Sequence, residues 1–109
     1  MGIADCEAIA YHAIYFHLIV LEFMREIILM SFSGPDRPQL SASLMQVLAA
    51  HSANILDVGQ AVIHDQLSLG VVVESPSAQE SAMLMKDVLF RAHDIGLLVR
   101  FTPISIDSY

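Results

Sequence analysis

The sequence has few positive charges and a single cysteine, and each shortage excludes a class of function. Five lysine and arginine residues stand against twelve aspartate and glutamate residues, a formal net charge of −7 in 109 residues. Because this charge repels phosphate backbones and anionic lipid surfaces, we expect neither nucleic acid nor a membrane among the partners. The lone cysteine, Cys6, excludes an intrachain disulfide framework and any metal site built from several cysteines.

Motifs for catalysis are also missing. The chain has no Gly-x-Ser-x-Gly elbow, no phosphate-binding loop and no Gly-x-Gly-x-x-Gly fingerprint. No two of the five histidines have the i, i+4 spacing of a helical zinc site. Asp57, Asp65 and Glu74 share no spacing that predicts an acid/base pair. We therefore expect no catalytic residue, no metal site and no cofactor in this chain.

Residues 1–23 form an apolar stretch that stands apart from the rest. Its uncharged run, residues 8–21, is shorter than the ~20 residues of a membrane helix, and no basic start marks a secretory signal. Apolar side chains recur at helical spacing and also occupy the other faces. Two interpretations stay open: this extension is buried against the domain, against another copy or in an aggregate, or Met24 is the natural start and the stretch is an upstream artefact.

Residues 24–104 have the alternating periodicities of one α+β domain, followed by a tail at 105–109. The pattern predicts strands at 26–33, 55–63, 67–73 and 97–102, with helices at 38–51 and between Ser77 and Gly96. Ser77 and Glu80 fit a capping box, and Gly96 suits the end of the second helix. The order βαββαβ with right-handed crossovers predicts a ferredoxin-like fold, a four-stranded antiparallel sheet with both helices on one face.

Each helix shows one apolar stripe that predicts its buried face. The first stripe comprises Leu40, Leu44, Val47 and Leu48, and the second comprises Met85, Val88, Leu89 and Ala92. On the second helix, Lys86, Asp87, Arg91 and Asp94 are expected to face water. His64-Asp65-Gln66 is expected to connect the middle strands, and Pro103 to end the last strand.

The segment between the first strand and the first helix is the best candidate for a binding site. A helix start offers backbone N–H groups and the positive end of the helix dipole, which suit a carboxylate. Asp36 could meet an ammonium group, and Asn54, at the start of the second strand, offers both a donor and an acceptor. These groups suit a zwitterion such as a free amino acid. The alternative is that the prolines shape a turn, Asp36 caps the helix and Asn54 fills a loop.

The stretch SGPDRPQLSASLMQVLAAHSANILD resembles the ACT domain, a βαββαβ regulatory module of amino-acid metabolism, in its D-R-P-x-L start and later N-I pair. More closely, MREIILMSFSGPDRPQL, NILDVGQAVIHDQLSLGVVVE and KDVLFRAHDIGLLVRFTPIS resemble the N-terminal regulatory part of bacterial phosphoserine phosphatases. In the family, amino acids bind at interfaces between paired domains. By position, the resemblance implies a site formed by Asp36, Arg37, Pro38, Gln39, Leu40, Asn54, Ile55 and Asp57.

The resemblance further implies a regulatory chain of L-serine biosynthesis in the cytoplasm that binds L-serine and pairs with a second copy or another ACT domain. The phosphatase motif Asp-x-Asp-x-Thr does not occur, so the catalytic half, where Mg²⁺ would be expected, is absent from this chain. The alternative function is an association module that binds no small molecule.

One position departs from the family pattern. Gln39 stands where a glycine usually follows D-R-P, and its side chain is expected to crowd a carboxylate on the helix start. Gln39 is expected in the first turn of the helix, where glutamine, a better helix former than glycine, strengthens the helix start. On that view, Gln39→Gly lowers thermal stability slightly and raises serine affinity.

Overall fold

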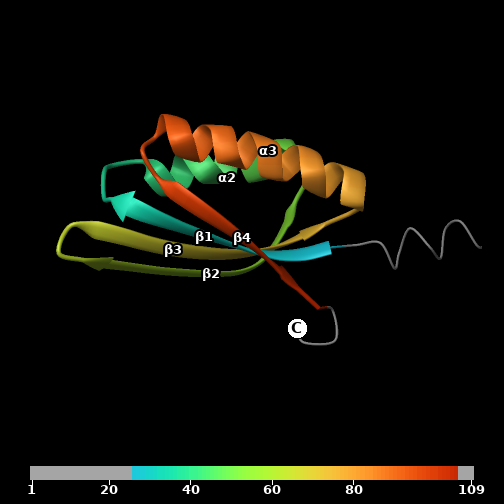
Figure 1. Ribbon diagram of the computed structural model, residues 1–109, viewed down its shortest axis with the longest axis horizontal. Helices are drawn as coiled ribbons and strands as arrows, with labels where there is room; N and C mark the ends of the chain where they lie inside the picture. The colour runs from blue at the N-terminus through green and yellow to red at the C-terminus, as the bar shows by residue number, and fades with distance from the viewer. Residues whose placement is uncertain (1–25, 106–109) are drawn as a thin grey trace, which may run out of the picture.

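The computed structural model describes residues 26–105, which form an antiparallel sheet with two helices packed on one of its faces (Figure 1). The elements in chain order are β1 (Glu26–Pro35), α2 (Leu40–Ala50), β2 (Asn54–Ile63), β3 (Gln66–Ser75), α3 (Ala78–Asp94) and β4 (Leu98–Ile104). The predicted ferredoxin-like βαββαβ fold is confirmed. The predicted N-terminal extension and most of the predicted tail lie outside the described residues.

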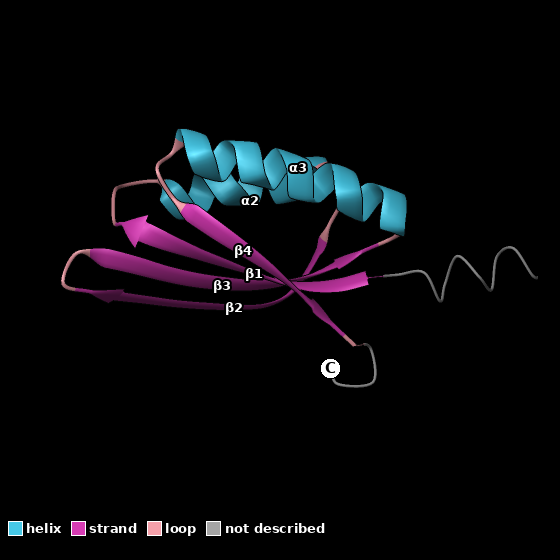
Figure 2. Cartoon of the chain, viewed as in Figure 1, coloured by secondary structure: helices cyan, strands magenta, loops and turns pink. Residues whose placement is uncertain are grey.

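The sheet has the strand order β2-β3-β1-β4, with every neighbouring pair antiparallel. β1 runs through the middle, and its Met30 lies opposite Val71 of β3 and Phe101 of β4. Figure 2 shows α2 and α3 side by side above this sheet. β2 and β4 are therefore the two edges.

The core lies between the helices and the near face of the sheet. Alternate residues of β1 and β3 point into it because side chains along a strand alternate between its two faces. The predicted stripe of the first helix is fully buried there, as expected. The core residues of these three elements are Ile28, Met30, Phe32, Leu40, Leu44, Val47, Leu48, Leu67, Leu69, Val71 and Val73.

The predicted buried face of α3 is wrong by part of a turn. Leu84 is buried, with 1% of its surface exposed, whereas Leu89 is 52% exposed. The buried stripe runs through Ser81, Leu84, Val88 and Ala92. A leucine stands on each of two neighbouring faces, so hydropathy alone did not separate them, and packing on the sheet selected the face with Leu84. The predicted N-cap is confirmed: Ser77 Oγ accepts from the Glu80 N–H at 3.1 Å.

Three predicted boundaries differ from the structure for local reasons. α2 begins at Leu40 rather than Pro38, because Gln39 takes a left-handed backbone conformation. Pro103 lies within β4 instead of ending it, and an edge strand tolerates the missing N–H. The middle connection has two residues rather than three. His64 and Asp65 both have positive φ, 51° and 64°, as in a type I′ hairpin turn.

β2 departs most from a simple two-faced strand. A register shift between Ile55 and Asp57 makes Leu56 the extra residue of a β-bulge. Every residue of β2 except Leu56 is exposed, including Val58 and Val62 on the side facing the helices. The predicted alternation therefore holds only after the bulge, and β2 is an exposed edge that carries apolar side chains.

Candidate functional site

The loop that joins β1 to α2 lies at one end of the sheet, beside two other connections (Figure 1). The backbone N–H of Asp36 donates to the carbonyl of Asp65 in the β2–β3 turn at 2.9 Å. The guanidinium of Arg37 donates to the carbonyl of Ile95, which follows α3. These two contacts hold the loop between the hairpin and the α3–β4 turn.

Arg37 occupies its place because the α3–β4 turn carries no side chain beside it. Gly96 has φ 78°, and a Cβ there would lie 2.7 Å from Arg37 Nη2. Glycine thus suits this position for its backbone conformation, and the missing side chain leaves the space that the guanidinium occupies. At least one Arg37 N–H is used to hold the fold, and the guanidinium has further donors for a ligand.

Gln39 does not lie in the first turn of α2, where the sequence placed it. It is the N-cap residue, with φ 68° and ψ 12°, and its side chain forms no capping hydrogen bond. The first turn of α2 also contains no acidic residue. The helix start therefore keeps the positive potential that suits a carboxylate. The left-handed backbone explains why a glycine is suited to this position.

The expected effect of Gln39→Gly on stability is consequently reversed. Glycine relieves the cost of a left-handed backbone, about 1–2 kcal/mol, and loses part of that gain through its greater freedom in the unfolded chain. We expect the free energy of unfolding to rise by about 0.5–1 kcal/mol, measured by urea denaturation. Gln39→Ala is the matched control, because it removes the side chain and keeps the strained backbone. Equal stability of both variants would contradict this explanation.

The second group of predicted site residues lies at the opposite end of the same sheet. Asn54 pairs with Glu74, whereas Pro35, just before the loop, pairs with Gln66. The eight-residue step along β3 between these pairs corresponds to about 27 Å. One copy of the chain therefore brings Asp36, Arg37, Pro38, Gln39 and Leu40 together but keeps them apart from Asn54, Ile55 and Asp57.

The residues at the start of β2 lie at the surface. Asn54 and Asp57 are exposed, and 40% of the Ile55 surface is exposed. The Asp57 carboxylate accepts from the backbone N–H of Val58 at 2.9 Å, so the bulge fixes its direction. These side chains are accessible to a ligand or to a second protein chain.

Sequence reasoning missed one polar cluster, which lies between the two helices. His51 Nε2 is 2.6 Å from the Asp87 carboxylate and His51 Nδ1 is 3.9 Å from that of Glu80. Arg91 donates to Ser43 Oγ at 2.9 Å. The residues come from both ends of α2 and from the length of α3, so only the packing of the helices reveals the cluster. Among residues 26–105, no group of His, Cys, Asp and Glu side chains is arranged to hold a metal ion.

The uncovered face of the sheet has a shallow hollow of about 460 Å³ near β4. Small hydroxyl side chains, Ser31, Ser33 and Ser68, form its floor, and Leu98 and Arg100 border it. It lies on the face opposite the helices and contains none of the predicted site residues. In the part of the chain described here, no helix has the length and apolar character needed to cross a membrane.

Comparison with known proteins agrees with the βαββαβ fold described above. Phosphoserine phosphatase SerB2 of Mycobacterium tuberculosis is 37% identical over 71 residues, which are 64% of this chain and 17% of that protein. UPF0237 protein PAE3582 of Pyrobaculum aerophilum is 27% identical over 85 residues, 77% of this chain and 94% of that protein. The crystallised ACT domain protein from Streptococcus pneumoniae has the same fold, with a TM-score of 0.65 at 18% identity over 77% of this chain and 96% of that one.

The chain thus spans a small part of the phosphatase and nearly all of the UPF0237 protein. The family match covers residues 26–102, from the first residue of β1 into β4. This range contains the first three strands, both helices, most of β4 and every predicted site residue. The chain belongs to the ACT domain family.

Proposed function

We propose that this chain is a regulatory module that binds a small amino acid, with L-serine as the first candidate, between two copies of itself. The supporting observation is the separation of the two groups of site residues within one copy. The residues of the β1–α2 loop suit both charged ends of a zwitterion, and Asn54 offers a further donor and acceptor, but neither group of residues encloses a ligand alone. The likeness to phosphoserine phosphatase SerB2 supports a role in a phosphoserine phosphatase-like protein of L-serine biosynthesis.

Contacts at the start of α2 support the binding mode. The open N–H groups of the first helical turn are suited to the ligand carboxylate, and Asp36 to its ammonium group. Ser41 Oγ donates to Gln60 Oε1 at 3.2 Å, so the helix start lies directly beside the exposed edge β2. A ligand on this helix start would therefore lie close to whatever covers that edge.

Antiparallel pairing of β2 with β2 of a second copy would complete the site. Because the strands would run in opposite directions, the start of one β2 would lie near the hairpin end of the other. Asn54 of one copy would then approach the α2 start of the other. The exposed apolar side chains Val58 and Val62 would be covered in the same interface.

A module that only associates is the second candidate function. The side chain of Gln39 stands at the helix start, where it crowds a ligand, and the apolar edge β2 favours pairing with or without a ligand. In this alternative, the two copies pair through the sheet and bind no amino acid.

Calorimetric titration of the full chain with L-serine, alongside light scattering, distinguishes the two functions. Saturable heat from a dimer supports amino-acid binding, and L-alanine and D-serine test the contributions of the hydroxyl group and of handedness. A dimer that gives no heat with any of the three leaves association as the function. A clean monomer that gives no heat contradicts both.

A further inference from the structure

The outer side of α3 carries acidic and apolar side chains in strict alternation. Glu80, Met83, Asp87, Phe90 and Asp94, here called the α3 seam, follow one another at steps of three, four, three and four residues. This spacing is that of a heptad repeat, with acids at the a positions and apolar residues at the d positions. The seam runs about 21 Å along the helix.

The seam is accessible along its length. Met83 is 51% exposed and Phe90 is 59% exposed, and 53% of the Asp87 side chain is exposed. The buried stripe of α3 lies on another side of the helix, so the fold of this chain does not use these apolar side chains. Two large apolar side chains kept in water at heptad spacing indicate a surface for another helix.

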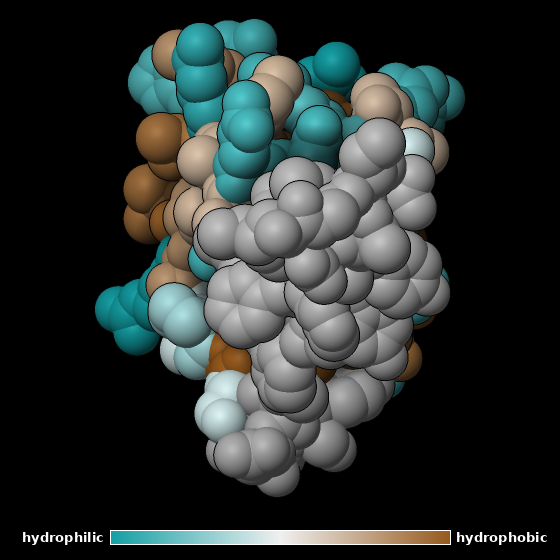
Figure 3. Space-filling model, turned by 90° about the vertical axis from the view of Figure 1, so that its right-hand side faces the viewer, coloured by the Kyte–Doolittle hydropathy of each residue, from teal (hydrophilic) through white to brown (hydrophobic). Residues whose placement is uncertain are grey.

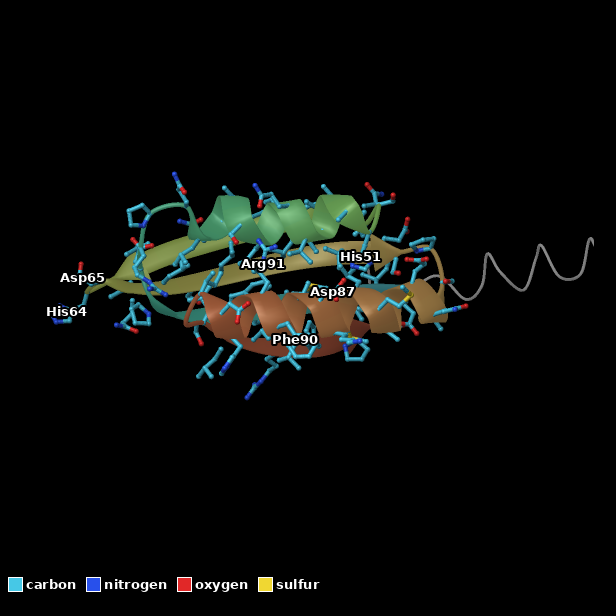
Figure 4. The ribbon with its side chains drawn as sticks, turned by 90° about the horizontal axis from the view of Figure 1, so that it is seen from above. His51, His64, Asp65, Asp87, Phe90 and Arg91 are labelled. Carbon is cyan, nitrogen blue, oxygen red and sulfur yellow. The ribbon has the colours of Figure 1, made fainter. Side chains whose placement is uncertain are left out.

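A groove beside the seam gives this surface its shape. It lies between α2 and α3, has a volume of about 300 Å³, and is lined by Val47, Ala50, Phe90, Asp87 and Asp94 together with Gln46, His51 and Arg91. Figure 4 looks onto both helices, with His51 and Arg91 between them and Phe90 on α3. In Figure 3, the helical layer at the top is mostly hydrophilic, with apolar residues set among polar ones.

Two basic side chains, His51 and Arg91, also line the groove, and both are engaged by neighbouring side chains. Arg91 is held inward by Ser43 of α2, and His51 is turned to Asp87. Lys86 is the exposed cation of α3 outside the groove lining, and it falls at a g position, on the flank of the seam. It would meet an acidic residue at a flanking position of an incoming helix.

We propose that the α3 seam and the adjoining groove dock an amphipathic helix of a partner protein, with lysine or arginine opposite the three acids and apolar side chains on Met83 and Phe90. Charge selects this occupant. A second α3 would bring three acids against three acids, and residues 1–23 contain acids and no lysine or arginine. A helix with cations at heptad spacing satisfies both sets of positions.

The test uses synthetic helical peptides of three heptads with a fluorophore, titrated with the full chain by anisotropy. One peptide has lysine at a and leucine at d, the second has glutamate at a, and the third has the first composition in scrambled order. We expect the lysine peptide to bind and the other two to bind at least tenfold more weakly. Equal binding of the lysine and scrambled peptides, or no binding of the lysine peptide, overturns the proposal.

Variants of α3 locate the contact. Phe90→Ala should weaken binding of the lysine peptide about tenfold, whereas Leu89→Ala, at a residue that is 52% exposed and lies outside the seam, should leave binding unchanged. Asp94→Asn should weaken it about threefold, and Leu89→Lys, with the same change of net charge, should not. Matching effects within either pair would overturn the proposal, because the peptide would then respond to overall charge or apolarity and not to the seam.

Discussion

Replacing Phe32 with alanine should lower the free energy of unfolding by about 3–5 kcal/mol. Phe32 is 1% exposed and lies in β1 between Leu69 of β3 and Val99 of β4, on the side that faces the helices. Removal of the ring loses its buried area and leaves a cavity in the middle of the sheet, where three strands limit collapse. In a domain of this size the thermal midpoint should fall by at least about 12 °C.

Phe90→Ala is the control for this prediction, because it removes the same ring from an exposed site on α3. Urea denaturation of both variants should show a large loss for Phe32→Ala and less than about 1 kcal/mol for Phe90→Ala. Similar losses for the two variants would show that the core is not centred on β1. The small loss at Phe90 also ensures that its effect on peptide binding is measured on folded protein.

Asp36→Ala and Asn54→Ala should each abolish amino-acid binding when tested alone. Mixing the two variant proteins should restore part of the binding. In a symmetric dimer, each site would use Asp36 of one copy and Asn54 of the other. A mixed dimer then has one site with both residues intact and one site with neither. After random exchange, about a quarter of the parent's sites should be active, as measured by calorimetric stoichiometry.

The mixing experiment also tells the possible failures apart. If both residues act within one copy, each variant is inactive and the mixture remains inactive after exchange. If one variant alone binds as well as the parent, that residue lies outside the site. Light scattering on the same samples verifies that the variants still associate, so loss of pairing is not mistaken for loss of ligand contacts.

The sequence was sufficient to predict the fold because the helical and the strand spacing of apolar residues are ambiguous at few places. The stripe from Leu40 to Leu48 has one buried phase, and Ser77 with Gly96 marks both ends of α3. The phase of α3 was not predictable, since Leu84 and Leu89 offered two faces and only the sheet decided between them. The left-handed backbone at Gln39 was not predicted either, because glutamine ordinarily favours a helix interior, although the glycine usual at this position in the family is suited to such a backbone.

The sequence predicted which residues belong to the candidate site, but it did not predict how far apart they lie in one copy of the chain. The residues of the β1–α2 loop are adjacent in sequence, and they remain adjacent in the structure. Asn54 belongs to the far end of β2, a distance set by strand length and antiparallel direction. The α3 seam was not predicted for a different reason. Its acids are typical of an ordinary solvent-exposed helix face, and only the structure shows that Met83 and Phe90 are exposed between them.

The bond between Arg37 and Ile95 gives the loop a mechanical link to the last turn of α3. Ile95 directly follows Asp94, the final residue of the seam, so if the proposed amino acid took the Arg37 guanidinium from the Ile95 carbonyl, the end of the seam would lose this contact. Thermodynamic linkage would make such an effect reciprocal: if the two proposed events are coupled, a partner that immobilises this end of α3 would change amino-acid affinity by the same factor. In that case a single guanidinium would couple the two proposed binding events, which occur on different surfaces of this domain.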